Sequence, residues 1–163
     1  MTVQEAFLLR SLDQLVRVAA ELDRYREVTA EELNADLSLR WAVERGLLAG
    51  VGLALQTADH ILANHFRRTP DTYEGLLRDL HTVGVIGNDA SRQLKGAGGF
   101  RNVLVHEYVK VDLREVVRFA AAAPCILRAF ARRCAPVARG QNRLRLTGAQ
   151  RVTHHHLVPL PLA

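Results

Sequence analysis

Three side chains that can act on a phosphate lie close together in the sequence, at Arg101, Asn102 and His106. Arginine can bind phosphate oxygens through two parallel N–H donors, and histidine exchanges protons near neutral pH. On a helix, Asn102 and His106 are about 40° apart around the axis, whereas Arg101 is about 140° from His106 and reaches the same region with its long side chain. This set suits cleavage of RNA, because the ribose 2′-hydroxyl supplies the nucleophile and no metal is needed.

Tyr108 adds a phenol two residues after His106. On an unbroken helix its side chain points about 160° away from His106, so it joins the others only if the helix ends near Glu107. As bare spacing, an arginine followed by four residues and a histidine is a weakly specific pattern. The alternative interpretation is a surface arginine and a hydrogen-bonded histidine at a helix end.

A carboxylate earlier in the chain is a further candidate for the site. Asp59 lies in a predicted long helix that can pass near the motif, where its carboxylate would orient Arg101 or His106. The alternative is an ordinary ion pair or a polar helix face. The glycine-rich stretch 96–99 follows no predicted strand, so the sequence does not predict a phosphate-binding loop there.

Apolar residues repeat at helical spacing along the segments that must position these side chains. The first helix begins with the capping pair Thr2 and Glu5 and extends to about Glu27. A second capping pair opens a short helix, and a long helix follows from about Asp36 to Phe66. The second capping pair is Thr29 with Glu32, and the apolar seam of the first helix consists of Leu8, Leu12, Leu15, Ala19 and Leu22.

Three later helices complete the predicted set. Pro70 is placed in the first turn of a helix whose apolar stripe begins at Tyr73. Asn88 can cap the next helix, which runs through the glycine-rich stretch and carries the motif. Asp112 caps the last helix, which Pro124 should bend because proline removes one backbone hydrogen bond.

Glycines lie inside two of these predicted helices. Gly46, Gly50 and Gly52 each weaken the long helix by up to about 1 kcal/mol relative to alanine. We interpret them as points of close helix–helix packing, with a flexible or ligand-facing point as the alternative. The glycines at 96–99 are equally costly unless another element packs against the bare backbone.

The absence of strand alternation and of repeats predicts an all-α fold, an antiparallel helical bundle. The domain is expected to cover residues 1–134. From residue 135 onward prolines, arginines and histidines replace the helical periodicity, so residues 135–163 are interpreted as a flexible basic tail. His154–His156 would bind metal there only adventitiously.

The formal net charge of +5 is distributed unevenly along the chain. Residues 1–87 carry 9 basic and 13 acidic side chains, whereas residues 88–134 carry 9 basic and 4 acidic ones. The remaining four basic residues lie in the tail. The domain is therefore polarised, with its basic part around the motif, as a polyanionic partner requires.

The sequence predicts no membrane span, no disulfide framework and no metal site. No apolar run approaches the roughly 20 residues of a membrane span. Cys125 and Cys134 form no CxxC, so the cytoplasm is the expected compartment. His60 and His65 diverge by about 140° on a helix, a poor ligand pair. We expect these histidines and His81 to be hydrogen-bonded or exposed.

The motif resembles the Arg-x4-His-x-Tyr signature of the HEPN family, in the branch of HepT-like toxins. The resemblance covers about residues 1–134 and includes the flanks of the motif. The similar segments are Arg24-Tyr25-Arg26, the 41–66 helix with Ala58-Asp59-His60-Ile61, Tyr73 before Leu76-Leu77, the lead-in Gly99-Phe100-Arg101-Asn102-Val103, and the exit Tyr108-Val109-Lys110-Val111-Asp112.

The resemblance implies a metal-independent endoribonuclease toxin of a toxin–antitoxin pair, working as a homodimer whose motif helices meet at a shared cleft. Arg101 would position the phosphate, His106 would be the acid/base, and Asn102 would orient the phosphate or the histidine. Tyr108 would be the AMP acceptor, adenylylated with ATP by a minimal nucleotidyltransferase antitoxin so that RNA is blocked. The toxin itself would need no cofactor.

A second interpretation fits the same residues. In it the chain is a non-catalytic nucleotide- or partner-binding module that serves only as substrate or scaffold of the nucleotidyltransferase. Cleavage of RNA in the presence of EDTA distinguishes the two.

Overall fold

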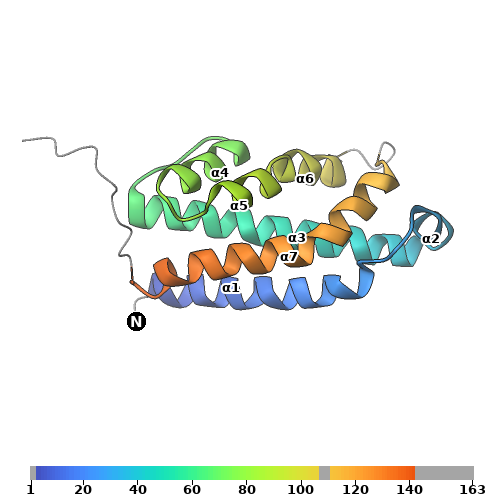
Figure 1. Cartoon of the computed structure of the whole chain (residues 1–163), viewed down its shortest axis with the longest axis horizontal. Helices are drawn as coiled ribbons and strands as arrows, with labels where there is room; N and C mark the ends of the chain where they lie inside the picture. Colours follow the sequence, from blue (N-terminus) through green and yellow to red (C-terminus); the bar gives the residue numbers. More distant parts are fainter. Residues whose placement is uncertain (1–2, 107–110, 142–163) are drawn as a thin grey trace, which may run out of the picture.

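The computed structural model describes residues 3–106 and 111–141, and these residues form helices and connecting turns without a strand (Figure 1). Three long helices make the body of the bundle: α1 (Val3–Leu22), α3 (Leu37–Ile61) and α7 (Leu113–Ala138). The first of these runs antiparallel to the other two, as the colours of Figure 1 show. The expected antiparallel, all-α bundle is confirmed.

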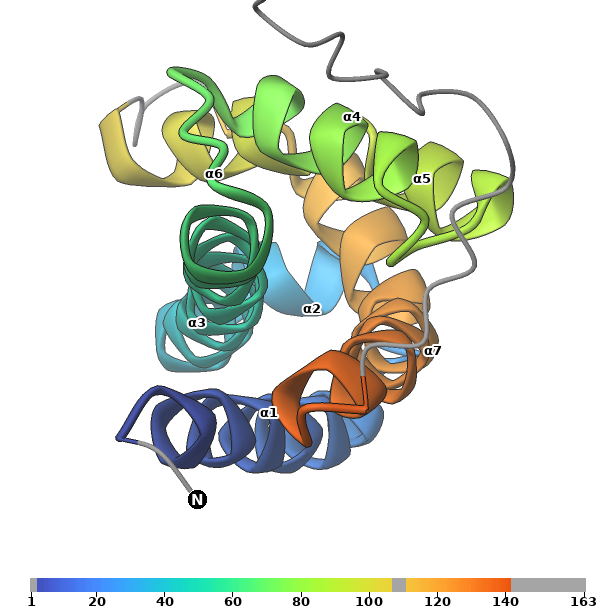
Figure 2. The same ribbon diagram turned by 90° about the vertical axis from the view of Figure 1, so that its left-hand side faces the viewer.

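Three shorter helices form an outer layer on α3 and α7. They are α4 (Tyr73–Thr82), α5 (Asn88–Leu94) and α6 (Ala97–His106). Figure 2 looks along the bundle and shows this layer on the side opposite α1. A short helix, α2 (Ala30–Ala35), packs against α3 and α7 at one end. The helix that carries the motif therefore lies in the outer layer.

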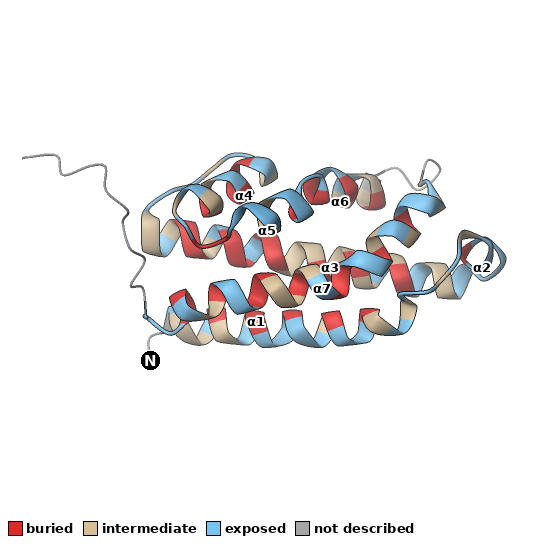
Figure 3. Cartoon of the chain, viewed as in Figure 1, coloured by how far each residue is buried: buried red, intermediate tan, exposed pale blue. Residues whose placement is uncertain are grey.

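The apolar faces of the helices turn toward a common core (Figure 3). The predicted seam of α1 is buried, with each of its five residues at most 6% exposed. From α7 the largest contribution is Phe130, which is fully buried. Because each buried leucine or phenylalanine contributes about 1.5–3 kcal/mol, burial rather than helix propensity stabilises the bundle.

Two of the predicted caps are present in the structure. The Thr29 hydroxyl accepts a hydrogen bond from the Glu32 amide at 3.2 Å, and the Glu32 carboxylate accepts one from the Thr29 amide at 2.8 Å. Asp112 caps α7 by accepting from the Arg114 amide at 2.9 Å. The Arg114 side chain also donates to this carboxylate, which lowers the pKa of Asp112. Thr2 lies outside the described residues.

Three predictions about helix boundaries in the outer layer are wrong. Pro70 does not lie in the first turn of α4, because Thr72 is the N-cap of that helix. The N-cap of α5 is Gly87 rather than Asn88. The single helix expected from there onward is divided into α5 and α6, because Gly96 adopts a φ of +85°, a left-handed conformation that ends a helix.

The first and last long helices also differ from their expected bounds. A 3₁₀ turn, η1 (Asp23–Tyr25), follows α1, so the α-helix is shorter than predicted. At the other end, α7 continues past residue 134 to Ala138, and both Val137 and Ala138 are buried. The start of the expected tail is therefore helical. Residues 142–163, with His154–His156, lie outside the described part.

The three glycines of α3 differ in their surroundings. A Cβ on Gly46 would lie 2.9 Å from Leu22 Cδ2, and one on Gly50 would lie 2.6 Å from Leu127 Cδ1. These two glycines confirm the prediction of close helix packing. Gly52 has no neighbour within 4 Å of such a Cβ, because it faces a pocket.

A π-helical turn, η2 (Leu62–Phe66), continues α3. The combined stretch, 37–66, is long and apolar enough by length and composition alone to cross a membrane. Core helices of soluble proteins pass the same test, and 44% of the most apolar window is buried inside this bundle. The hydropathy of this helix is therefore weak evidence for a membrane span.

Candidate active site

Helix α6 carries Arg101 and Asn102 in its middle and His106 as its last residue. The backbone of this helix thus places the three residues on one short element, as the sequence predicted. The side chain of His106 lies outside the described part of the structure, as do residues 107–110 with Tyr108.

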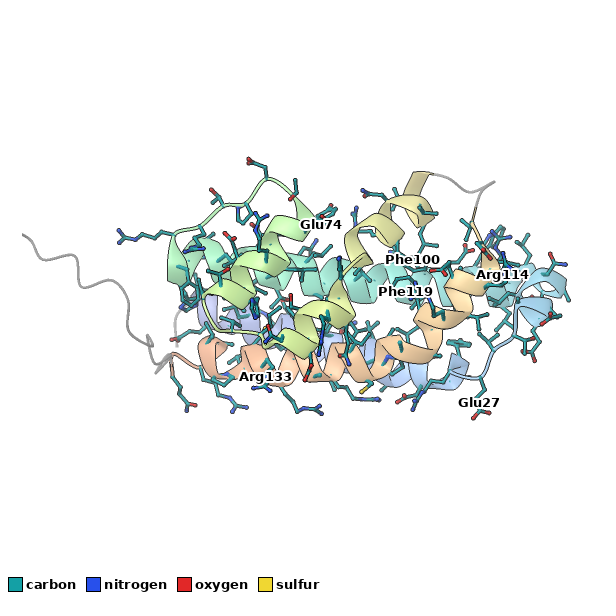
Figure 4. The ribbon with its side chains drawn as sticks, turned by 45° about the horizontal axis from the view of Figure 1, so that its top comes forward. Glu27, Glu74, Phe100, Arg114, Phe119 and Arg133 are labelled. Carbon is teal, nitrogen blue, oxygen red and sulfur yellow. The ribbon has the colours of Figure 1, made fainter. Side chains whose placement is uncertain are left out.

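Aromatic stacking holds α6 on the bundle. The rings of Phe100 and Phe119 are 3.9 Å apart between centroids and nearly parallel, at 16°, so they join α6 to α7 (Figure 4). One turn later Leu104 is also buried. With this face turned inward, Asn102 is about 160° around the helix from Phe100 and is exposed, whereas Arg101 lies on the flank and is half-buried.

Tyr73, the first residue of α4, contacts the guanidinium of Arg101. The Arg101 Cζ lies 5.3 Å from the centroid of the Tyr73 ring, which is cation–π distance. Among the described residues no carboxylate lies within ion-pair distance of Arg101. The side chain of Arg101 is therefore held by the ring and makes no ion pair within the described residues.

The contact between α4 and α6 requires a glycine. A Cβ on Gly98 would lie 2.7 Å from Tyr73 Cβ, and Gly98 itself is buried. The neighbouring Gly99 is exposed, and a Cβ added there would meet nothing within 4 Å. The bare backbone of Gly98 thus lets the start of α4 approach the motif helix closely.

Arg101 lines a half-open pocket of about 280 Å³ between α3, α6 and the start of α4, which we call the Arg101 pocket. Asp59 of α3 lines the same pocket, so the structure brings these two predicted residues to one place. Asp59 is exposed and makes no ion pair with Arg101. Among the other lining residues are Gly52, Gln56, Asp71 and Tyr73.

Asn102 opens onto a different, shallower hollow, which we call the Asn102 groove. This groove is lined by Gly98 and Gly99 of α6 and by residues 71–74, including Glu74 on the outer surface of α4 (Figure 4). Residues 71–73 line both hollows, so the Arg101 pocket and the Asn102 groove adjoin at the segment that leads into α4.

Two residues of this site were not predicted for it. The sequence predicts Tyr73 only as part of an apolar stripe, and it predicts close packing at the glycines 96–99 without indicating which of them is packed or against what. A local signal was present, because Gly98 and Arg101 are three apart and therefore lie on one face of a helix. A glycine at that position indicates that another element packs beside the arginine.

The histidines outside the motif only partly match their prediction. His60 contacts Phe7, with ring centroids 4.7 Å apart. The Nε2 atoms of His60 and His65 are buried without a hydrogen-bond partner in the described part of the chain, so the expectation that both are hydrogen-bonded or exposed is wrong for this atom. Within residues 3–106 and 111–141 no group of three potential metal ligands is found.

Comparison with known families finds one that accounts for most of the chain. The family described as Ribonuclease HepT-like matches residues 15–133. This span contains α3, the Arg101 pocket, the Asn102 groove and the motif as far as Tyr108. No curated protein sequence matches the chain.

Several solved structures have a similar fold. YutE from Bacillus subtilis, described as a cytosolic protein of unknown function, has a TM-score of 0.71 at 18% identity, covering 84% of this chain and 92% of YutE. A tri-AMPylated Shewanella oneidensis HEPN toxin in complex with an MNT antitoxin has a TM-score of 0.65 at 18% identity, covering 82% and 97%. A toxin–antitoxin structure with AMP-PNP has a TM-score of 0.65 at 17% identity, covering 82% and 98%.

Proposed function

The chain belongs to the HepT-like ribonuclease family, and we propose that it is the endoribonuclease toxin of a toxin–antitoxin pair, cleaving RNA without a metal. The observation on which the proposal rests is the environment of the Arg101 guanidinium. This group lines a pocket, is held by an aromatic ring and has no carboxylate partner among the described residues. A positive charge kept free in this way is suited to bind a phosphate.

The proposed reaction uses one phosphate and the neighbouring ribose. Arg101 binds the phosphate oxygens and stabilises the charge that develops on them. His106, one turn beyond Asn102 on the same helix, takes the proton of the 2′-hydroxyl or protonates the leaving oxygen. Asn102 orients the phosphate or the histidine. Asp59, in the Arg101 pocket, is the candidate that supports Arg101 from α3.

We propose that the active unit is a homodimer with the motif helices of two subunits at a shared cleft. One arginine and one histidine are few groups for RNA cleavage, and two-fold symmetry supplies a second set. The outer position of α6 supports this arrangement, because the exposed side of the motif helix is open to a partner.

We propose that the partner is a minimal nucleotidyltransferase antitoxin, which acts in the cytoplasm on Tyr108. Support comes from the similar HEPN toxin of Shewanella oneidensis, which is AMPylated and bound to an MNT antitoxin. An AMP group on Tyr108 would place a phosphate and a base beside the motif and block access of RNA. The toxin needs no cofactor in this scheme, because ATP is consumed by the antitoxin.

Cleavage of single-stranded RNA in EDTA tests the proposed nuclease. We expect the wild type to cleave, and Arg101→Ala and His106→Ala each to lower kcat/KM by about 100-fold or more, the range typical of an acid/base group or a charge-stabilising donor. Arg133→Ala is the matched arginine control, because Arg133 is exposed on α7 and lines neither hollow (Figure 4).

Two outcomes would contradict the proposed nuclease function. Cleavage that is unchanged in both motif variants would identify a contaminating enzyme. A wild type that binds RNA or nucleotide but does not cleave would favour the non-catalytic module.

A further inference from the structure

The aromatic ring under Arg101 belongs to no part of the motif, yet it is the contact that holds the motif arginine. We propose that Tyr73 is a positioning residue for Arg101, holding the guanidinium through a cation–π contact so that its N–H donors are left for an RNA phosphate. The inference rests on the ribonuclease function proposed above and assigns to that site a residue 28 positions earlier in the chain.

An arginine side chain can be held by a carboxylate or by an aromatic ring, and the geometry distinguishes these two arrangements. A carboxylate binds the N–H edge, which is the edge that binds phosphate, and cancels the charge. An aromatic ring attracts the cation through its quadrupole and leaves the charge uncancelled. With Arg101 Cζ 5.3 Å from the ring centroid and no ion-pair partner in the described residues, Arg101 is held by the ring and not by a carboxylate.

The position of the ring is itself determined by the surrounding backbone. Tyr73 directly follows the N-cap Thr72, whose hydroxyl accepts a hydrogen bond from the Gly75 amide at 3.0 Å. On the other side its Cβ packs against the bare backbone of Gly98. A capped helix start and a close helix contact thus fix Tyr73 from two directions, and the half-buried ring can act as a support for Arg101.

Substitution of Tyr73 in the full chain tests the proposal by RNA cleavage. We expect Tyr73→Leu, which keeps an apolar side chain but no ring, to lower kcat/KM by about 5- to 30-fold, the effect of losing one cation–π contact. Tyr73→Phe keeps the ring and should rescue most of this loss. Tyr25→Leu is the matched control, because Tyr25 is a half-buried tyrosine of η1 that lines neither hollow.

A double-mutant cycle distinguishes positioning from a general effect on the fold. The readout is the Kd for a 2′-O-methyl RNA, which lacks the attacking hydroxyl and so does not depend on cleavage. We expect Tyr73→Leu to weaken binding in the wild type but to change it by less than about twofold in the Arg101→Ala background. Equal losses in both backgrounds would overturn the proposal.

A graded series keeps the test valid if Tyr73→Leu does not fold. Phenylalanines with one, two and three ring fluorines at position 73 keep the shape of the ring but progressively weaken its quadrupole. RNA binding should fall stepwise along the series, and a flat series would overturn the inference. If the wild type cleaves no RNA, the proposed function fails, whereas the binding series still decides whether the ring holds Arg101.

Discussion

At the scale of single residues, Arg101 differs from the other arginines around the motif. Three of them form pairs with carboxylates close in sequence: Arg92 with Asp89, Arg114 with Asp112, and Arg118 with Glu115. These exposed pairs contribute little to stability, but each partly neutralises its arginine. The excess of basic residues counted in 88–134 therefore overstates the charge available to RNA, whereas Arg101 forms no ion pair within the described residues.

The proposed AMP acceptor is also tested at this scale. The chain has three tyrosines, Tyr25, Tyr73 and Tyr108. After incubation with the antitoxin and ATP, we expect intact-mass spectra to show AMP adducts on the wild type, on Tyr25→Phe and on Tyr73→Phe, but not on Tyr108→Phe. Adducts that persist on Tyr108→Phe would remove Tyr108 as the acceptor.

At the scale of elements, the position of α6 depends on a helix break before it and on two contacts in its first half. Gly96 breaks the preceding helix, Gly98 contacts the start of α4, and Phe100 stacks on α7. The break gives α6 an axis of its own, so that it can lie along α3 while presenting Arg101 to the pocket. The placement of Arg101 thus depends on two packing contacts made by neighbours of the motif.

Adjacent glycines of α6 give a matched pair of variants. Alanine is favoured over glycine in a helix by up to about 1 kcal/mol, so Gly99→Ala, which meets open space, should not lower stability. At Gly98 a new Cβ 2.7 Å from Tyr73 Cβ must push α4 and α6 apart, and we expect a net loss of about 1–2 kcal/mol together with reduced RNA cleavage.

Urea unfolding of the two glycine variants measures this difference. Gly98→Ala as stable as Gly99→Ala would show that α4 and α6 can separate without cost. The proposed fixation of Tyr73 by Gly98 would then be wrong.

At the scale of the whole molecule, the cations of residues 88–134 that form no ion pair within the described residues lie in two places. Lys95 and Arg101 lie on the outer layer formed by α5 and α6, whereas Arg132 and Arg133 are exposed on α7. In the proposed dimer, Lys95 and Arg101 of one subunit would lie near their copies in the other subunit, where the phosphates of RNA are expected to lie. Their local field would attract a polyanion more strongly at low ionic strength.

Mixed dimers test the shared cleft. We expect purified dimers with one His106→Ala subunit to retain less than the one-half of wild-type activity that two independent sites would leave, because the shared cleft would lack one of its two histidines. Differentially tagged subunits allow purification of the mixed species, and dimers of two wild-type subunits carrying the same tags are the control. Activity at or above one-half would contradict the shared site.

The sequence by itself determined the features that depend on nearby residues. Helical periodicity predicted the bundle and the buried seam of α1, and short-range hydrogen bonding predicted the caps at Thr29 and Asp112. The order of motif residues along one helix was predicted for the same reason. Each of these properties depends on residues that are at most four positions apart or that repeat at that spacing.

Only the tertiary structure decided which distant residues meet the motif. Tyr73 contacts Arg101, and Asp59 lines the same pocket, because α4 and α3 pack beside α6, and no local pattern fixes this arrangement. The same holds for the glycines: Gly98 and Gly99 are equivalent by propensity, but only Gly98 faces another helix. Packing between helices depends on the shapes of many side chains at once. The contact of Tyr73 with Arg101 is therefore evident only in the tertiary structure.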